Sequence, residues 1–260
     1  MCKECGCGLG GDDVKIGGHS HEHGHDHGHS HAHGHGHDHE HSHGGKTLSL
    51  NLSLMEKNNR LAERNRGFFR AKKLLVLNVV SSPGSGKTTF IRETAAKLAG
   101  KLRVGVIVGD LATDNDAARL RTAGIPVVQI TTGTVCHLDA DMIAKAAAQL
   151  DLDKLDVLVI ENVGNLVCPA DYDLGEDLRV VLLSVTEGED KPLKYPPMFH
   201  SAHVAVVTKS DMAAAAGFDR ELALQNLERV SHHARIFELS AKTGDGMKAW
   251  LDFLAEQRAA

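Results

Sequence analysis

The chain has 260 residues, with 34 acidic and 29 basic side chains, a formal net charge of −5 and only 4% aromatic residues. This length fits one large domain or two small ones, and the acidic balance with few aromatic rings argues against a nucleic-acid-binding protein. No apolar run approaches the roughly 18 residues that a membrane-spanning helix needs, and the first residues are rich in Cys and Gly instead of forming a secretory signal. We therefore expect a cytoplasmic protein without membrane contact, whose five cysteines are thiols or metal ligands.

The first segment of the chain, residues 1–46, consists largely of Gly, His, Cys and acidic residues. It cannot bury enough apolar surface to fold without metal. Within it, Cys2, Cys5 and Cys7 place three thiolates close together. Thiolates together with the amino-terminal amine are suitable ligands for Ni²⁺ or Zn²⁺. The sequence therefore predicts a flexible metal-binding tail over residues 1–46.

A histidine tract occupies every odd position from 19 to 43, and only Gly, Asp, Glu, Ser and Ala separate its members. Neutral imidazole is a good ligand for Ni, Zn, Cu and Co, so the tract is typical of a multi-site chelator that releases metal below a pH of about 6.5. An affinity tag is the alternative, although tags are usually contiguous histidines. The tract members are His19, His21, His23, His25, His27, His29, His31, His33, His35, His37, His39, His41 and His43.

After the tail, the segment 48–70 carries Leu50, Leu54, Leu61 and Phe68 with charged residues between them. This spacing predicts one amphipathic helix that leads into the domain.

From residue 73 onward, short apolar runs alternate with helical segments. The pattern predicts an α/β domain over residues 47–260, with a mostly parallel sheet and helices on both faces. The expected strands are 74–80, 104–109, 127–130, 157–161, 178–185, 203–208 and 235–239. The expected helices lie near 87–99, 115–123, 139–150, 219–230 and 246–257, with Gly100 and Gly124 where helix ends are expected.

A P-loop, S-S-P-G-S-G-K-T-T, follows the first of these strands at residues 81–89. Small residues let backbone N–H groups cradle phosphate oxygens, while Lys87 places a cation on the β and γ phosphates and Thr88 can bind Mg²⁺. Ser81 stands where the general pattern has its first glycine. The phosphate-binding residues are predicted to be Gly84, Ser85, Gly86, Lys87, Thr88 and Thr89, which makes the domain a P-loop NTPase.

Two acidic residues complete the predicted Mg²⁺ site with Thr88. Asp110 ends the second strand, and Glu161 opens an E-x-x-G variant of the D-x-x-G switch in which Gly164 senses the γ-phosphate. Capping or surface carboxylates are the alternative. Asn165 stands where some fast GTPases have a water-orienting Gln, so we predict hydrolysis well below a typical turnover of about 10 per second. The predicted catalytic residues are Lys87, Thr88, Asp110 and Glu161.

A third metal site is predicted from Cys136, His137 and Cys168, which follow two strands of the parallel sheet. Both loops then lie at the carboxyl edge of the sheet, beside the phosphates. Three ligands leave a position for water or a second subunit. Two buried cysteines and a surface histidine are the alternative. Because Cys168 lies on the segment that responds to the γ-phosphate, metal and nucleotide binding should influence each other.

The choice of base is predicted from two loops near the end of the chain. Thr208, Lys209 and Asp211 form a T-K-x-D motif after a strand, and a carboxylate there can accept both N1–H and N2–H₂ of guanine. Thr208 replaces the more usual Asn, which predicts a looser bracing of the loop. Ser240, Ala241 and Lys242 form an S-A-K motif after the next strand, where the second guanine-contacting loop is expected. GTP is thus favoured over ATP. The residues added to its predicted site are Gly164, Lys209, Asp211, Ser240, Ala241 and Lys242.

Together these motifs resemble the HypB family of nickel-incorporation GTPases for hydrogenase maturation. The resemblance includes M-C-x-x-C-G-C at the start, E-N-V-G-N-L-V-C-P-A at 161–170 and E-G-E-D-K-P-L-K-Y-P at 187–196. It implies a GTP-dependent nickel chaperone for [NiFe] hydrogenase that dimerises through its G-domain. It also implies two partners, the zinc-binding protein HypA and the hydrogenase large-subunit precursor.

The resemblance also implies two metal sites. A high-affinity nickel site falls on the Met1 amine, Cys2, Cys5 and Cys7. A G-domain site for Ni²⁺ or Zn²⁺ falls on Cys136, His137 and Cys168. The residues before Cys136 are T-G-T-V, where family members often have a Lys. Because the chain has both the Cys motif and a long His tract, we expect it to store nickel as well as deliver it.

Two other functions are compatible with parts of the sequence. A urease nickel-insertion GTPase is related, but such proteins typically have a Cys-Pro-His motif and lack the amino-terminal thiol motif. A nickel or zinc storage protein would need only residues 1–46, which leaves the motif-rich remainder unexplained.

Overall fold

The computed structural model describes residues 15–16 and 43–259. The predictions for the thiol motif of residues 1–7 and for the tract histidines up to His41 lie outside the described residues. Of His43, the backbone is described, as the first residue of helix α1 (His43–Ala71). The division of the chain at residue 46 stays a prediction.

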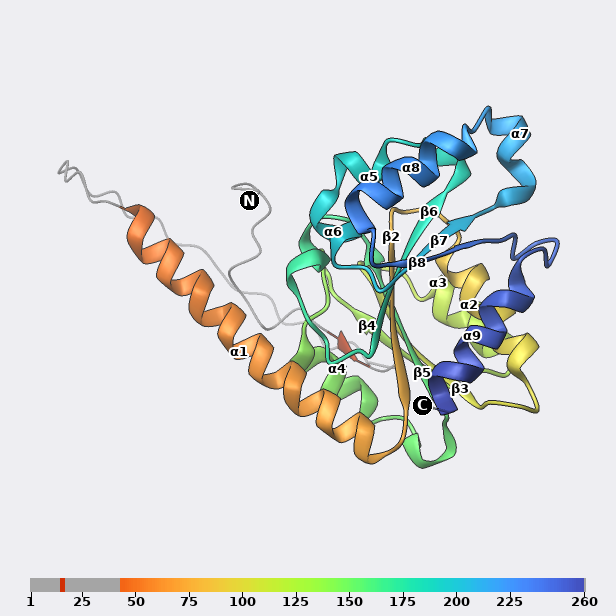
Figure 1. Ribbon diagram of the computed structural model, residues 1–260. Coiled ribbons are helices and arrows are strands. Elements are labelled where there is room, and N and C mark those ends of the chain that lie inside the picture. Colours follow the sequence, from red (N-terminus) through yellow and green to blue (C-terminus); the bar gives the residue numbers. More distant parts are fainter. Residues whose placement is uncertain (1–14, 17–42, 260) are drawn as a thin grey trace, which may run out of the picture.

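A parallel sheet forms the centre of the domain (Figure 1), which confirms the predicted fold class. In the described residues the strand order is β1-β4-β3-β5-β2-β6-β7-β8, with the short β1 pairing antiparallel at the β4 edge. Every predicted strand is present, and β5 continues past residue 161 to Gly164. The strands are β1 (Lys15–Ile16), β2 (Leu75–Ser81), β3 (Val104–Asp110), β4 (Val127–Thr131), β5 (Val157–Gly164), β6 (Leu178–Ser184), β7 (Val204–Thr208) and β8 (Arg235–Glu238).

Helices cover both faces of the sheet (Figure 1). Successive strand residues point to opposite faces, so Leu77 packs beneath α2, α3 and α9, whereas Val76 packs beneath α1 and α4. The five predicted domain helices are confirmed, and the short α5, α6 and α7 are additional. In addition to α1, the described α-helices are α2 (Lys87–Leu98), α3 (Asn115–Thr122), α4 (Ala140–Ala147), α5 (Lys191–Lys194), α6 (Pro196–His200), α7 (Ala213–Ala216), α8 (Arg220–Ser231) and α9 (Met247–Ala259).

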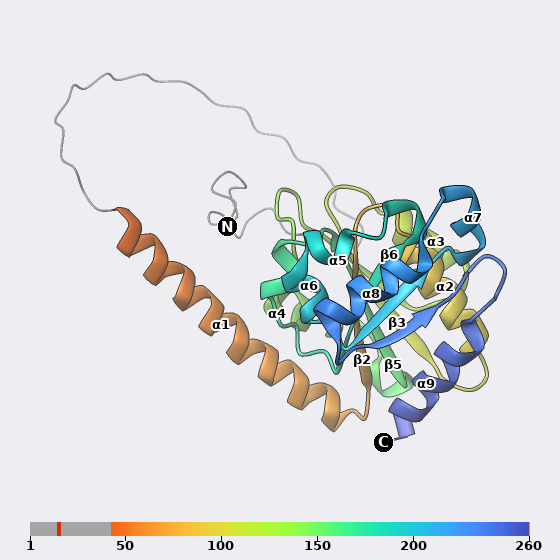
Figure 2. The same ribbon diagram turned by 45° about the horizontal axis from the view of Figure 1, so that its top comes forward.

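Helix α1 is present as predicted, but two of the apolar residues that predicted it are exposed. Leu54 and Phe68 are 44% and 48% exposed. The buried stripe instead contains Ala62, Phe69 and two asparagines. The amino-terminal half of α1 extends away from the sheet, as both ribbon views show (Figure 2).

The two asparagines attach α1 to the domain. Asn65 donates to the carbonyls of Ala140 and Leu174, at 2.7 and 3.2 Å. Asn58 donates to the carbonyl of Asp173 at 2.8 Å and accepts from the backbone N–H of Ala140 at 3.0 Å. Buried polar groups are tolerated when they are hydrogen-bonded, so α1 docks through amide contacts that an apolar pattern cannot reveal.

Candidate functional site

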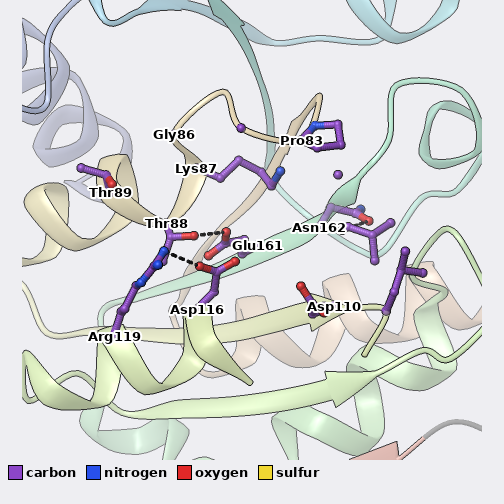
Figure 3. Close-up of a pocket in the computed structure, with 15 residues that line it drawn as sticks. Pro83, Gly86, Lys87, Thr88, Thr89, Asp110, Asp116, Arg119, Glu161 and Asn162 are labelled. Carbon is purple, nitrogen blue, oxygen red and sulfur yellow. Dashed lines mark hydrogen bonds and ion pairs between the residues drawn. The ribbon is translucent and has the colours of Figure 1, made fainter. Parts of the chain in front are cut away.

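The P-loop lies between the carboxyl end of β2 and the start of α2, above a cavity of about 450 Å³. Gly84 and Gly86 have φ values of +77° and +95°, a region that favours glycine because other residues have a Cβ. The cavity is open to the backbone of this turn and to the side chains of Lys87 and Thr88 (Figure 3). Its position at the carboxyl edge of a parallel sheet is where such sheets bind ligands.

Ser81, at the position of the first glycine of the P-loop pattern, contacts the P-loop lysine. Its side chain is fully buried, and its hydroxyl accepts a hydrogen bond from Lys87 Nζ at 3.1 Å. Burial lowers the pKa of Lys87, and the nearby Glu161 carboxylate opposes that shift. The hydroxyl therefore orients the lysine toward the cavity.

Glu161 is the predicted Mg²⁺ ligand that the structure places best. Its Oε1 accepts from the Thr88 hydroxyl at 2.7 Å (Figure 3). The residue is 2% exposed, and Oε2 is buried without a hydrogen-bond partner. A buried, unpaired carboxylate oxygen costs free energy, and a bound cation would satisfy it. Asp110 lines the same cavity, so the predicted set of Thr88, Asp110 and Glu161 fits Mg²⁺, which prefers oxygen ligands.

The burial of Glu161 has a consequence for stability. Burial raises its pKa from 4.5 to about 7, although the Thr88 hydrogen bond and the Lys87 charge oppose the shift. Between these two pH values, Glu161 is protonated in the folded state but ionised in the unfolded state. In chelator-treated, nucleotide-free protein we expect the free energy of unfolding to fall by roughly 3 kcal/mol as the pH rises through this window.

Urea unfolding at about pH 5 and about pH 8 measures this effect. Glu161→Gln cannot ionise, so the difference between the two proteins isolates the contribution of Glu161 from that of other titrating groups. An equal pH dependence of stability in both proteins would contradict the expectation.

Three further polar residues that line the cavity were not predicted. Asp116 and Arg119 come from α3 and form an ion pair at 3.2 Å, and Asn162 follows Glu161 (Figure 3). The acidic run around Asp116, just after the strand that ends at Asp110, was the available signal. Asp116 on α3 therefore lines the same cavity as Asp110 at the end of β3.

Two residues of the E-G-E-D-K-P motif also contact the P-loop without having been predicted as site residues. The Glu187 carboxylate accepts a hydrogen bond from the Ser85 hydroxyl. Lys191 Nζ donates to the Ser82 hydroxyl at 3.3 Å. The motif after β6 therefore packs against the phosphate-binding loop through these two hydrogen bonds.

The two loops predicted to read guanine lie together beside the P-loop. The Ser240 hydroxyl donates to Asp211 Oδ1 at 2.7 Å, and Lys209 Nζ donates to the Gly84 carbonyl at 2.7 Å. The Thr208 hydroxyl donates to the Ser85 carbonyl at 3.0 Å. The Thr208 hydroxyl thus connects this loop to the P-loop backbone, and the looser bracing predicted for Thr208 stays a prediction.

The predicted G-domain metal residues are only partly brought together. The sulfur atoms of Cys136 and Cys168 lie 3.0 Å apart. The His137 ring stacks on Tyr172, with ring centroids 3.9 Å apart, and its buried Nδ1 has no hydrogen-bond partner. Burial lowers the pKa of His137, which favours the neutral imidazole. Within residues 15–16 and 43–259, no three His, Cys, Asp or Glu side chains already form an arrangement that could hold a metal ion.

The segment after Glu161 joins the cavity to these thiols. A Cβ on Gly164 would lie 2.9 Å from Pro83 Cγ, so this glycine lies directly against the P-loop. The next residue, Asn165, donates from Nδ2 to the Cys136 carbonyl at 3.1 Å. Its Oδ1 accepts from the Val167 backbone N–H at 2.9 Å. The P-loop and Cys136 thus contact two adjacent residues, Gly164 and Asn165.

A buried polar chain leads from the cavity toward α1. Asn162 Nδ2 donates to Asn78 Oδ1 at 3.1 Å, and Asn78 Nδ2 donates to Glu176 Oε1 at 3.1 Å. Arg179 pairs with Glu176 at 2.9 Å, and both side chains are almost fully buried. Burial raises the pKa of Glu176, but the Arg179 charge and hydrogen bonds outweigh it and hold the pKa below its usual value.

We expect Glu176→Ala to destabilise the protein by about 3 to 5 kcal/mol, because it leaves the buried Arg179 charge without a partner. Asp252→Ala is the control, since it removes an exposed partner of Lys248 and should change stability by less than about 1 kcal/mol. The midpoint of urea unfolding measures the stability of both variants, provided that the dependence of the unfolding free energy on urea concentration is unchanged. Similar midpoints for the two variants would show that the buried pair contributes no more than a surface pair.

The fold and the site define a P-loop nucleotide-binding protein of the α/β class. None of the helices in the part of the chain that the structure describes is long and apolar enough to cross a membrane. The sequence profile of the "CobW/HypB/UreG, nucleotide-binding domain" family matches residues 75–238.

Similarity to individual proteins extends beyond the profile. Hydrogenase maturation factor HypB of Escherichia coli strain K12 is 52% identical over 215 residues, which cover 83% of this chain and 74% of that protein. Hydrogenase/urease maturation factor HypB of Helicobacter pylori is 40% identical, over 82% of this chain and 89% of that protein. The crystal structure of Helicobacter pylori HypB in complex with nickel has a TM-score of 0.75 and 42% identity, and covers 78% of this chain and 95% of that chain. The chain belongs to the HypB family.

Proposed function

We propose that this protein is a GTP-dependent nickel-delivery protein that supplies Ni²⁺ for the assembly of [NiFe] hydrogenase. The name of its Escherichia coli relative as a hydrogenase maturation factor supports the target. The nickel in the Helicobacter pylori structure supports the cargo. The T-K-x-D and S-A-K loops beside the P-loop support guanine as the base.

The observation that carries the proposal is the hydrogen bond from Asn165 to the Cys136 carbonyl. Asn165 directly follows Gly164, which lies against the P-loop. A γ-phosphate that moves Gly164 therefore also moves the backbone of the thiol pair. By linkage, the nucleotide then changes nickel affinity and nickel changes nucleotide affinity to the same extent.

GTP hydrolysis requires water to attack the γ-phosphorus while the bond to the β–γ bridging oxygen breaks, which yields GDP and phosphate. The Lys87 cation stabilises the charge on the transferred group. Thr88, Asp110 and Glu161 would hold Mg²⁺, which when bound neutralises charge on the β and γ phosphates. Asn165 is hydrogen-bonded to Cys136 instead of orienting water, which supports slow intrinsic hydrolysis.

Cys136 and Cys168 are the proposed thiolate ligands of nickel in the domain, and Zn²⁺ suits the same donors. His137 becomes the third ligand if its ring turns away from Tyr172, and a second subunit completes the site in a homodimer. Met1, Cys2, Cys5 and Cys7 bind nickel first, and the histidine tract stores it. HypA and the hydrogenase large-subunit precursor are the proposed partners, in the cytoplasm.

The coupling is tested by nickel titration of the full chain with a GTP analogue and with GDP. The thiolate-to-nickel absorption of the domain site is isolated as the difference between the wild type and Cys168→Ser. We expect different nickel affinities in the two nucleotide states, and a smaller difference in Asn165→Ala. Asn59→Ala, an exposed asparagine on α1, is the matched control. Equal affinities in both states of the wild type would defeat the mechanism.

The target is tested in cells by deleting the gene and assaying hydrogenase and urease with and without added nickel. Loss of hydrogenase activity alone, restored at least in part by nickel, is the expected result. Loss of urease alone would favour the urease alternative, which the double name of the Helicobacter pylori relative keeps open. Deleting residues 19–43 separates storage from delivery, because delivery at ample nickel should survive it.

A further inference from the structure

Four of the five histidines outside the tract lie at one end of the sheet. His200 ends α6, His203 precedes β7, and His232 and His233 follow α8. The His233 ring centroid is 5.4 Å from that of His200 and 5.4 Å from that of His232, edge-on in both cases. This is the amino end of strands β7 and β8, so the group lies at the edge opposite the nucleotide cavity.

We propose that His200 and His233 form a surface site for one borderline divalent metal ion of the Ni²⁺ and Zn²⁺ class. Two imidazole nitrogens that each lie about 2.1 Å from one ion place their ring centroids about 5 Å apart. The separation of 5.4 Å between these two rings matches that requirement. Both residues are exposed, so water can complete the coordination.

The hydrogen bonds of the rings identify which histidine is ready to bind. His200 Nδ1 lies 3.3 Å from the Val230 carbonyl. Because a carbonyl only accepts, the neutral ring carries its proton on Nδ1 and leaves Nε2 bare. Metal-binding histidines usually have this arrangement, with the other ring nitrogen donating to a carbonyl or carboxylate. His203 is the reverse, because its Nδ1 accepts from the Arg179 backbone N–H at 2.9 Å. The neutral His203 ring therefore carries its proton on Nε2 and is not a ligand.

Edge-on packing of imidazoles without metal is the competing explanation of the same geometry. The site does not depend on the proposed function, because it uses none of the cavity or thiol residues. It gives the folded domain a metal-binding place at the edge opposite the nucleotide.

The experiment is footprinting of the full chain with diethyl pyrocarbonate, which acylates unprotonated imidazole nitrogens, with and without nickel chloride. Mass spectrometry of peptides reads each histidine separately, so binding to the tract does not mask the result. We expect nickel to slow the labelling of His200 and His233 and to leave His203 unchanged. In His233→Gln, half-protection of His200 should need about tenfold more nickel or more, whereas His232→Gln should retain the protection.

Equal labelling of His200 with and without nickel would overturn the site. Protection of His200 that survives His233→Gln would also overturn it, because the two rings would then not share an ion. Loss of protection in His232→Gln would contradict the assigned pair. Substitutions at these exposed positions are expected to leave the fold intact, which urea unfolding of each variant verifies.

Discussion

Replacing Asp211 with asparagine is expected to weaken GTP binding by about 10² to 10⁴-fold, since two hydrogen bonds to a charged acceptor are worth about 3 to 6 kcal/mol together. The Ser240 hydroxyl holds Asp211 Oδ1 at 2.7 Å, so the carboxylate is oriented before the base arrives. Guanine offers N1–H and N2–H₂ to that carboxylate. An asparagine presents an amide donor in the same place, which opposes guanine but matches the carbonyl of xanthine. The variant should therefore gain affinity for xanthosine triphosphate.

Fluorescent-nucleotide competition with GTP, ATP and xanthosine triphosphate measures the exchange of specificity. Asp252→Asn makes the same chemical change on α9, where the carboxylate pairs with Lys248 at the surface, and should leave all three affinities unchanged. If Asp211→Asn bound GTP as tightly as the wild type, Asp211 would not be the residue that reads the base.

Replacing Lys87 with alanine is expected to slow GTP hydrolysis by about 10² to 10³-fold, the usual cost of removing one preorganised group that stabilises transition-state charge. Lys87 lies at the cavity with its Nζ held by the buried Ser81 hydroxyl. Burial already lowers its pKa, so the folded protein gains little from the cation in the absence of nucleotide. The loss should therefore fall on phosphate binding and catalysis and not on folding.

Single-turnover hydrolysis and the melting temperature of the free protein separate these effects. Lys97→Ala removes an exposed lysine from the same helix and should preserve the wild-type rate. A Lys87→Ala protein that hydrolyses GTP at the wild-type rate would contradict the assignment, and one that no longer folds would show that Lys87 has a structural role.

Local motifs were reliable where a short stretch of chain makes its own site. The P-loop residues follow one another in sequence, and the positive φ values of Gly84 and Gly86 are a property of that turn alone. Alternation of apolar runs and helices was equally sufficient for the parallel sheet, since strands buried on both faces need continuous apolar residues.

Contacts between distant residues could not be predicted in this way. Asn58 and Asn65 look like solvent-facing residues in the sequence, yet they dock α1 onto the backbone near Ala140 and Leu174. Likewise, Cys136 and His137 are neighbours in sequence, but the sulfur faces Cys168 and the ring stacks on Tyr172.

The sequence by itself determined the class of fold, the phosphate-binding loop and the family, because each depends on periodicity or on residues adjacent along the chain. Only the tertiary structure decided how Gly164 and Asn165 connect the P-loop to the thiols, which face of α1 is buried, and that His200 and His233 meet. These depend on pairs of residues from separate elements. Their distance is set by how the helices pack on the sheet, because buried polar groups must find partners wherever that packing brings them.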